Sequence, residues 1–169
     1  MLKVYLAARY SRHQEMLQYA AELERLHLEV TSRWINGSHE GPPAMSVLER
    51  SRLAQEDWED MRAADIVISF TEPPRSDASR GGRHVEFGAA LALGKMCVVI
   101  GHRENVFHCL PTVVFWETWE EALVGLKAKI FTSGVLWGYN KTCPCGFAYR
   151  ARTMDAISPP HECIPSGSS

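Results

Sequence analysis

The segment from Arg80 to Leu91 holds the residues whose types and spacing are best suited to chemistry. It reads RGGRHVEFGAAL, so Gly81 and Gly82 precede a stretch with helical character, and Glu86 falls in the first turn of that stretch. Glycines let a ligand approach the backbone closely, and a helix start offers free N–H groups. Glu86 is therefore a candidate catalytic carboxylate. The plainer alternative is a turn followed by an acid that complements the helix dipole.

A second carboxylate, Asp65, stands at the start of an apolar run and follows two alanines. An acid in that position is either a solvated cap or a group that reaches a ligand. Asp57 and Asp60 belong to the acidic run just before it, which we expect to face solvent. Asp77 lies in a long polar loop and could swing over a bound ligand.

The hydrophobic pattern alternates between short apolar runs and stretches of helical spacing. We expect strands at 2–8, 29–34, 65–70, 96–101 and 112–116. We expect helices at 10–27, 46–64 and 83–95, and a last one that Thr118 caps. Ser46 and Glu49 have the spacing of a capping box at the second helix.

This alternation predicts an α/β fold, a doubly wound parallel sheet of five strands in the flavodoxin-like order 2-1-3-4-5. Such a sheet binds its ligand beyond the carboxyl ends of the strands, so the loops after Ala8, Phe70 and Gly101 should meet there. We expect one domain over residues 1–132 and an irregular C-terminal extension over residues 133–169.

The composition excludes several functional classes. The chain has 169 residues, is 46% hydrophobic and carries 18 basic against 20 acidic residues, a net charge of −2. This charge gives no electrostatic case for binding a nucleic-acid polymer, and no apolar run approaches the roughly 20 residues that a membrane helix needs. The odd count of five cysteines and the lack of a signal-peptide pattern favour a reducing, cytoplasmic environment.

Four residues near the C-terminus could bind zinc, namely Cys143, Cys145, His161 and Cys163. Structural zinc sites use these ligand types, but their paired ligands are more typically separated by two residues or more. Free thiols are the favoured interpretation, and we predict no metal site.

Three segments together resemble the nucleoside 2-deoxyribosyltransferase family, which includes the related nucleoside 5′-monophosphate N-glycosidases. They are residues 5–11 (YLAARYS), 61–67 (MRAADIV) and 82–90 (GRHVEFGAA). The resemblance covers about residues 1–132. It implies a flavodoxin-like fold, a homodimer or higher homo-oligomer, and cleavage or transfer at the bond between a nucleobase and its sugar.

The resemblance also implies roles for individual residues. Glu86 would be the nucleophile, Asp65 would contact the nucleobase or sugar, and Tyr5 would orient the glutamate. Such a carboxylate can trap an oxocarbenium-like centre as an ester, with Asp65 as a candidate proton donor to the departing base and no cofactor required. The substrate-binding residues would be Ala8, Arg9, Tyr10, Ser11, Asp77, Gly81, Gly82 and His84.

Two departures from the family pattern leave alternatives open. Arg80 stands where the family has an acidic residue, which favours a nucleotide-binding or sensing module that keeps the pocket without turnover. Arg9 and Arg12 could hold a 5′-phosphate, but the first loop lacks a glycine-rich pattern, and this favours a nucleoside. Trp34 could stack on a base.

Overall fold

The computed structural model describes residues 1–37, 45–73, 81–133, 140–142 and 148–150. The chain divides into two compact units, Met1–Leu123 and Val124–Ser169. The domain boundary that we expect after residue 132 stays a prediction.

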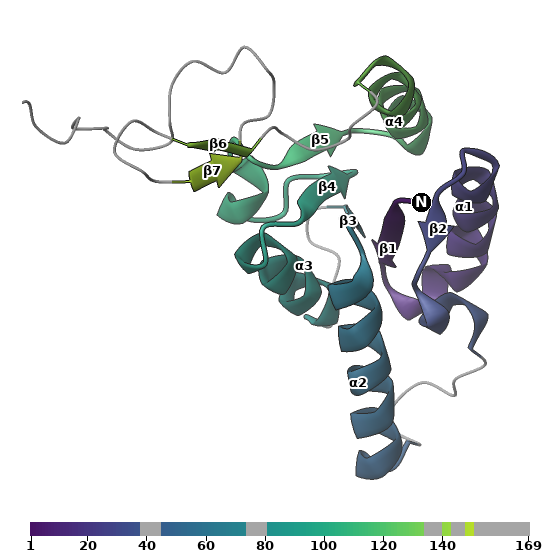
Figure 1. The fold of residues 1–169 in the computed structure, drawn as a ribbon. Helices are drawn as coiled ribbons and strands as arrows, with labels where there is room; N and C mark the ends of the chain where they lie inside the picture. The colour runs from purple at the N-terminus through teal and green to yellow at the C-terminus, as the bar shows by residue number, and fades with distance from the viewer. Residues whose placement is uncertain (38–44, 74–80, 134–139, 143–147, 151–169) are drawn as a thin grey trace, which may run out of the picture. The chain divides into compact units, whose positions relative to one another are not determined.

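The first unit is built on a five-stranded parallel sheet (Figure 1). Its strands are β1 (Lys3–Ala7), β2 (Glu29–Val30), β3 (Ile66–Phe70), β4 (Met96–Ile100) and β5 (Val114–Trp116). They lie in the order β2-β1-β3-β4-β5, and every pair is parallel. The predicted fold class is confirmed.

Helices and single 3-10 turns connect these strands. The helices are α1 (His13–Arg25), α2 (Val47–Ala63), α3 (Gly82–Ala92) and α4 (Trp119–Ser133). The 3-10 turns are η1 (Tyr10–Arg12), η2 (Arg33–Asn36) and η3 (Val106–Cys109). Within the described ranges, no helix combines the length and the apolar character needed to cross a bilayer.

The second strand is shorter than its sequence predicts. The expected strand over residues 29–34 ends at Val30, and η2 begins at Arg33. Ser32 is the reason, because its hydroxyl accepts the backbone N–H of Leu6 at 2.6 Å, a donor that a longer strand would have paired with a carbonyl. The short turn then buries Ile35.

The C-terminal extension holds regular structure that we did not expect. Two short strands, β6 (Asn140–Thr142) and β7 (Ala148–Arg150), pair antiparallel. The rest of the extension beyond Ser133 lies outside the described residues.

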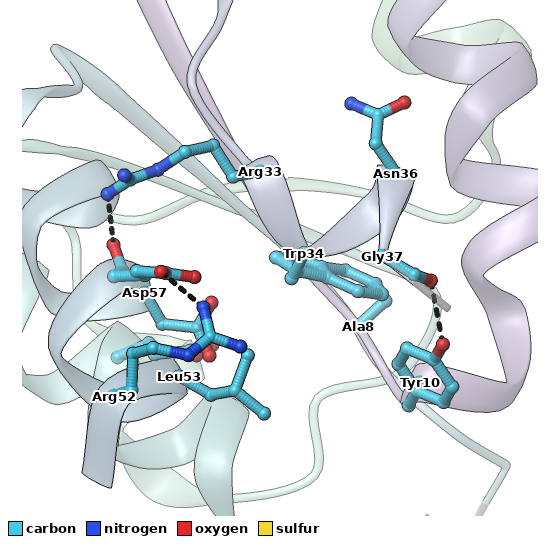
Figure 2. A pocket seen from close by; sticks show the side chains of 11 residues that line it. Ala8, Tyr10, Arg33, Trp34, Asn36, Gly37, Arg52, Leu53 and Asp57 are labelled. Carbon is cyan, nitrogen blue, oxygen red and sulfur yellow. Dashed lines mark hydrogen bonds and ion pairs between the residues drawn. The ribbon is translucent and has the colours of Figure 1, made fainter. Parts of the chain in front are cut away.

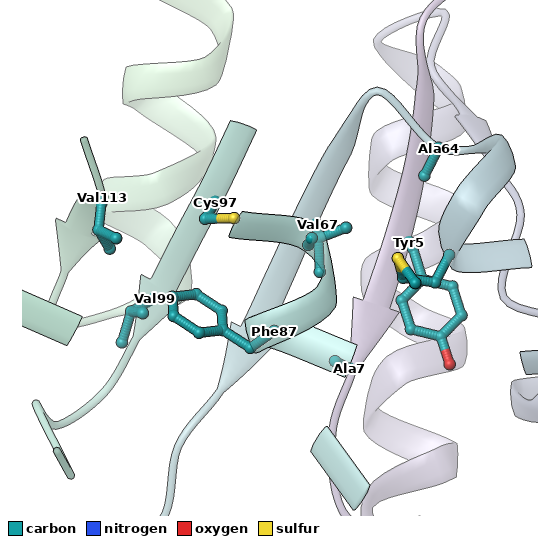
Figure 3. Close-up of a cluster of buried hydrophobic side chains, with 10 residues drawn as sticks. Tyr5, Ala7, Ala64, Val67, Phe87, Cys97, Val99 and Val113 are labelled. Atoms are coloured by element: carbon teal, nitrogen blue, oxygen red, sulfur yellow. The ribbon is translucent and has the colours of Figure 1, made fainter. Parts of the chain in front are cut away.

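The strand register decides which side chains face α2 and α3. Tyr5 pairs with Val67, and Val67 pairs with Cys97, so these three side chains lie on one face of the sheet. Figure 3 shows them in one buried cluster with Phe87 of α3. Tyr5 therefore points toward the helix that carries Glu86.

The carboxyl ends of β3 and β4 are joined by a close contact. The Thr71 hydroxyl donates to the carbonyl of Ile100 at 2.9 Å and accepts the N–H of His102 at 2.5 Å. Gly101 lies between those two residues with φ at 108°, and a Cβ there would come within 2.7 Å of the Thr71 Oγ1. Only glycine fits this position without strain.

The capping box predicted at the start of α2 is confirmed, and it provides a stability test. The Ser46 hydroxyl accepts the N–H of Glu49 at 3.2 Å, and a Glu49 carboxylate oxygen accepts the N–H of Ser46 at 2.9 Å. We expect Ser46→Ala to lower the free energy of unfolding by about 1 kcal/mol in urea denaturation. Ser51→Ala, at an exposed position inside the same helix, is the matched control. Equal losses for both variants would contradict the assigned cap.

Candidate active site

A cavity of about 460 Å³ opens at the carboxyl end of β1, between the first loop, η2, α2 and α3 (Figure 2). Its lining combines three carboxylates, two guanidinium groups and two aromatic rings. The lining residues are Ala8, Tyr10, Arg33, Trp34, Asn36, Gly37, Arg52, Leu53, Glu56, Asp57 and Glu86.

Glu86 is held in this cavity by its helix and by Tyr5. The buried side chains of α3 are Arg83, Phe87 and Ala90, and Glu86 follows Arg83 by three residues, on the flank of this buried face. The phenol hydroxyl of Tyr5 donates to a carboxylate oxygen of Glu86 at 3.0 Å. The structure thus brings together two of the three residues to which the resemblance gives catalytic roles.

The environment changes the proton affinity of both groups. Burial and the charge of Asp57 raise the pKa of Glu86 to about 7, although the hydrogen bond from Tyr5 acts to lower it. Burial and the Glu86 charge raise the pKa of Tyr5 well above its usual value. Tyr5 therefore remains a neutral phenol that can donate to an ionised Glu86.

Asp57 is the carboxylate that sequence reasoning missed. It lies one helical turn before the buried Met61 on α2, and it lines the cavity with Glu86. Burial, followed by the charges of Asp60 and Glu56, raises the pKa of Asp57 to about 6, and the charge of Arg33 opposes this rise. A carboxyl group with such a pKa can hold a proton near neutral pH.

The expectation that Asp57 and Asp60 face solvent was wrong. Asp60 is only 7% exposed. Its two carboxylate oxygens accept the backbone N–H of Arg33 at 2.9 Å and the Arg33 side chain at 2.8 Å. A spacing of four residues from Leu53 through Asp57 to Met61 is the signal that could have placed Asp57 on the inner side of the helix.

Asp65 does not reach the cavity. It is exposed and stands just before β3, and its carboxylate accepts the backbone N–H of Lys3 at 2.9 Å. Lys3 opens β1, whereas the cavity begins beyond the other end of that strand, at Ala8. Asp65 thus caps the amino edge of the sheet.

Of the four predicted binding residues in the loop after β1, two line the cavity and two do not. Ala8 and Tyr10 line the cavity, and the Tyr10 hydroxyl donates to the carbonyl of Gly37 at 2.8 Å. Arg9 instead pairs with Glu72 at 3.5 Å. Ser11 is exposed and does not line the cavity.

Trp34 is fixed as one wall of the cavity. Its indole N–H donates to the carbonyl of Leu6 at 2.8 Å, and its ring lies across from α2, where Arg52 and Leu53 point inward (Figure 2). Arg52 pairs with Glu56 at 2.5 Å. An aromatic ring facing polar groups that donate and accept hydrogen bonds suits a flat heterocycle.

The predicted residues at the start of α3 lie outside the cavity lining. Gly81 and Gly82 are exposed, and a Cβ at either would meet no atom within 4 Å. His84 faces Glu104, with 3.7 Å between Nε2 and the carboxylate. Asp77 lies outside the described residues, as does Arg80.

Glu104 joins the three loops that the sheet brings together. One of its carboxylate oxygens accepts from the buried guanidinium of Arg83 and from the backbone N–H of Glu72 at 2.9 Å. On the other side of the junction, Arg12 contacts the carbonyl of Thr71 at 3.4 Å. The predicted meeting of the loops after Ala8, Phe70 and Gly101 is confirmed.

His84, Glu104 and His108 are of the residue types that bind metal ions, and the side-chain atoms that could act as ligands lie within 4.8 Å of one another. Both nitrogens of His108 already have partners, because Nδ1 accepts the backbone N–H of Glu104 at 3.2 Å and Nε2 lies 3.1 Å from the side-chain amide of Asn105. Arg83 also neutralises Glu104. This arrangement favours a hydrogen-bonded structural cluster. The four candidate zinc ligands of the extension lie outside the described residues.

The raised pKa of Glu86 has a consequence for stability. The fold favours the protonated carboxyl, so its contribution is complete below the usual value of 4.5 and is lost as the pH rises through about 7. We expect the melting temperature of Glu86→Gln, relative to the wild type, to increase between pH 4.5 and pH 8 in calorimetry.

Glu49→Gln is a control of opposite sign, because hydrogen bonds from the backbone and side chain of Ser46 lower the pKa of Glu49. Its melting temperature relative to the wild type should fall as the pH rises toward the usual value of 4.5. A relative melting temperature of Glu86→Gln that does not change with pH would contradict a buried Glu86.

Comparison with known proteins gives a family and a set of similar folds. The sequence matches the profile described as nucleoside 2-deoxyribosyltransferase over residues 4–151. A search of curated proteins finds no match.

Among solved structures, a 2-deoxyribosyltransferase from Bacillus psychrosaccharolyticus is similar, with a TM-score of 0.57, 23% identity, 72% of this chain covered and 90% of the other. A 2-deoxyribosyltransferase from Leishmania mexicana has a TM-score of 0.51 and 17% identity, and the match covers 75% of this chain and 97% of the other. The CMP N-glycosidase BcmB of Clostridium botulinum has a TM-score of 0.48 and 22% identity, and the match covers 73% of this chain and 97% of the other. At these identities the likeness concerns the fold. The profile match spans most of the chain, and on that ground the chain belongs to the nucleoside 2-deoxyribosyltransferase family.

Proposed function

We propose that this protein cleaves the N-glycosidic bond of (deoxy)nucleosides or nucleotides, with Glu86 as the nucleophile. The observation that carries the proposal is the half-buried carboxylate of Glu86 in a cavity, bonded to the Tyr5 hydroxyl and accompanied by Asp57. Membership in the family supports the same class of reaction.

In the first step, an oxygen of ionised Glu86 attacks the anomeric carbon of the sugar from the face opposite the base. The bond between this carbon and the base nitrogen breaks, and its electron pair goes to the base. Asp57, whose pKa of about 6 lets it hold a proton, protonates the departing base. Tyr5 keeps Glu86 oriented and stabilises its charge until the ester forms.

In the second step, an acceptor attacks the same carbon and releases Glu86. Asp57, now ionised, takes a proton from the acceptor, which restores both carboxyl groups to their starting states. Water as acceptor gives hydrolysis, and the nitrogen of a second base gives transfer. Two displacements on one carbon retain its configuration.

We propose Trp34 as the platform for the base. Its fixed indole forms one wall, and Arg52 and Glu56 on the facing helix can donate to and accept from the edge of a heterocycle. Asp57 lies on the same helix, one residue beyond Glu56, and this placement lets a base on the platform reach its proton donor.

We also propose a homo-oligomer, as the family resemblance implies. The alanine-rich α3 leaves Val85 and Leu93 at 66% and 52% exposure in the single chain. Apolar side chains on a helix with small neighbours are suited to packing against another element.

The nucleophile is tested by Glu86→Gln, since an uncharged amide cannot form the ester. We expect kcat for base release from deoxynucleosides to fall by about a thousandfold or more, with chromatography of free base as the measurement. Glu120→Gln, an exposed change in the first turn of α4, is the matched control.

The wild type should also show a covalent sugar adduct by intact-mass spectrometry after an acid quench. Full activity of Glu86→Gln would remove Glu86 from the mechanism. Tight nucleoside binding without any base release would identify a sensing module instead.

The proton donor is tested by the pH dependence of kcat/KM. In the active form, Asp57 is protonated and Glu86 is ionised, so the two carboxyl groups together hold one proton. We therefore expect a bell-shaped profile with limbs near pH 6 and pH 7. Asp57→Asn should remove the alkaline limb and leave a single acid limb set by the ionisation of Glu86, at a pH below about 7 because the Asp57 charge that helps to raise the pKa of Glu86 is gone.

The same variant should lower kcat/KM by about 10²- to 10⁴-fold. Asp65→Asn is the matched control, because Asp65 lies at the amino edge of the sheet and bonds to the Lys3 backbone. A larger loss for Asp65→Asn than for Asp57→Asn would reverse the assignment.

A further inference from the structure

A buried carboxylate on α2 holds the turn that carries one wall of the cavity. Asp60 is 7% exposed and follows Asp57 by three residues on the same helix. One of its oxygens accepts the backbone N–H of Arg33 at 2.9 Å, and the other accepts the side-chain Nε–H of Arg33 at 2.8 Å. Arg33 opens η2, and Trp34 is the next residue. The Asp60 carboxylate therefore fixes the backbone directly before the Trp34 ring.

The turn η2 depends on this carboxylate because the residue before the turn does not cap it. The hydroxyl of Ser32 accepts the backbone N–H of Leu6 at 2.6 Å, and the Ser32 side chain makes no capping bond to η2. The first N–H groups of a helical turn need acceptors from outside the turn. Asp60 supplies one of these acceptors from a different element.

The guanidinium of Arg33 strengthens the same connection. Its Nη2 donates to the backbone carbonyl of Glu56 at 3.2 Å and to the carboxylate of Glu59 at 3.2 Å. Figure 2 shows this side chain reaching from η2 to the helix that carries Asp57. Arg33 and Asp60 thus join the element that bears the platform for the base to the element that bears the proton donor.

The same two residues determine part of the charge around Asp57. Burial makes the largest contribution to the raised pKa of Asp57, the charge of Asp60 makes the next, and the charge of Arg33 opposes both. Because Asp60 is buried, solvent ions screen its charge only weakly. The charged and titratable groups near Asp57 come from four elements and are Arg52, Glu56 and Asp60 of α2, Arg33 of η2, Glu86 of α3 and Tyr5 of β1.

From these contacts, and resting on the function proposed above, we propose that Asp60 is a positioning residue for the reaction. Its carboxylate holds the Trp34 platform against the helix of the proton donor, and its buried negative charge opposes a second negative charge on Asp57. Arg33 limits that repulsion through its guanidinium and anchors the turn through its backbone N–H. Asp57 and Trp34 line the described cavity but Asp60 does not, so Asp60 acts through these two residues.

The charge of Asp60 is tested by Asp60→Asn, whose amide oxygen can still accept the N–H of Arg33. Without the Asp60 charge, Asp57 loses its proton at lower pH. We therefore expect kcat/KM for base release from deoxynucleosides to fall about tenfold at pH 8 but about twofold or less at pH 5. A role in folding alone would lower the rate by the same factor at every pH, and equal losses at the two pH values would overturn the proposal.

Two further variants are matched to this change. Glu59→Gln removes an equal charge from α2 at an exposed side chain that contacts the same arginine, and its pH profile should be that of the wild type. Arg33→Gln removes the opposite charge but keeps the backbone N–H, so the ratio of its kcat/KM to that of the wild type should rise from pH 5 to pH 8. A ratio that falls with pH in Arg33→Gln would contradict the electrostatic role of the pair.

The connection to the platform is tested by Asp60→Ala, which removes the acceptor as well as the charge. With Glu86→Gln in both proteins to prevent cleavage, calorimetry should show a deoxynucleoside binding about five- to tenfold more weakly to Asp60→Ala than to Asp60→Asn. Circular dichroism checks the fold of both variants, and equal affinities would refute the connection. If Asp60→Ala does not fold, the pH dependence of Asp60→Asn still decides the proposal.

A titration without substrate separates this inference from the proposed reaction. NMR of protein labelled with ¹³C-aspartate follows the Asp57 carboxyl group directly, and Asp57→Asn identifies its signal. In Asp60→Asn the midpoint should lie at lower pH than in the wild type. If the wild type releases no base but the midpoint moves in this way, the reaction is refuted and the control of Asp57 by Asp60 stands. If the wild type releases base but the midpoint does not move, the reaction stands and this inference fails.

Discussion

The partial burial of the Glu86 carboxylate is the constraint on which the site depends. A carboxylate taken out of water needs hydrogen-bond donors or a proton, and Tyr5 supplies the donor at 3.0 Å. Tyr5 can do so only because the register of β1 against β3 directs its ring to the face that α3 covers. The reactivity of one side chain therefore follows from strand pairing in the centre of the sheet.

The carboxyl edge of the sheet is organised by charge rather than by apolar packing. Glu104 connects Glu72, the second residue beyond β3, with the first turn of α3, and the side chain of Glu72 pairs with Arg9 after β1. Because parallel strands end at one edge, their following loops bring acids and bases together in a small, half-buried space. Arg9, Arg12 and Arg83 each pair with a carboxylate on a different segment, and these ion pairs hold the loops relative to one another.

The fold could be predicted from sequence because its signals are local. The apolar runs 66–70 and 96–100 and the capping box at Ser46 each specify one element, and the handedness of crossovers then leaves few strand orders. The end of β2 could not be predicted, because it depends on a side chain of Ser32 that bonds to the backbone of β1.

Only part of the site could be predicted from sequence, because only some of its residues carry a local signal. Glu86 follows a glycine-rich helix start, and this local pattern identified it, whereas Tyr5 was named only through the family resemblance. Asp57 lies in a run of charged residues whose common position is the solvent-facing side of a helix, and only its spacing from Met61 sets it apart. Asp65 was given a role through the family resemblance, but it lies at the amino edge of the sheet, away from the cavity, since strand direction decides which end of a run meets the ligand.

A stack of aromatic side chains lies on the face of the sheet opposite to Tyr5, and it supports one of the arginines that follow β1. Phe70 stacks on Tyr19 with 5.4 Å between ring centres, and Tyr19 stacks on Trp119 at 4.3 Å, while Arg12 rests on the same Phe70 ring. A change of ring size behind the sheet would move Arg12, and with it Glu72, the carboxylate that Arg12 contacts at 3.6 Å. Substitutions of aromatic residues that do not line the cavity can therefore alter the charged contacts that hold the loop after β1.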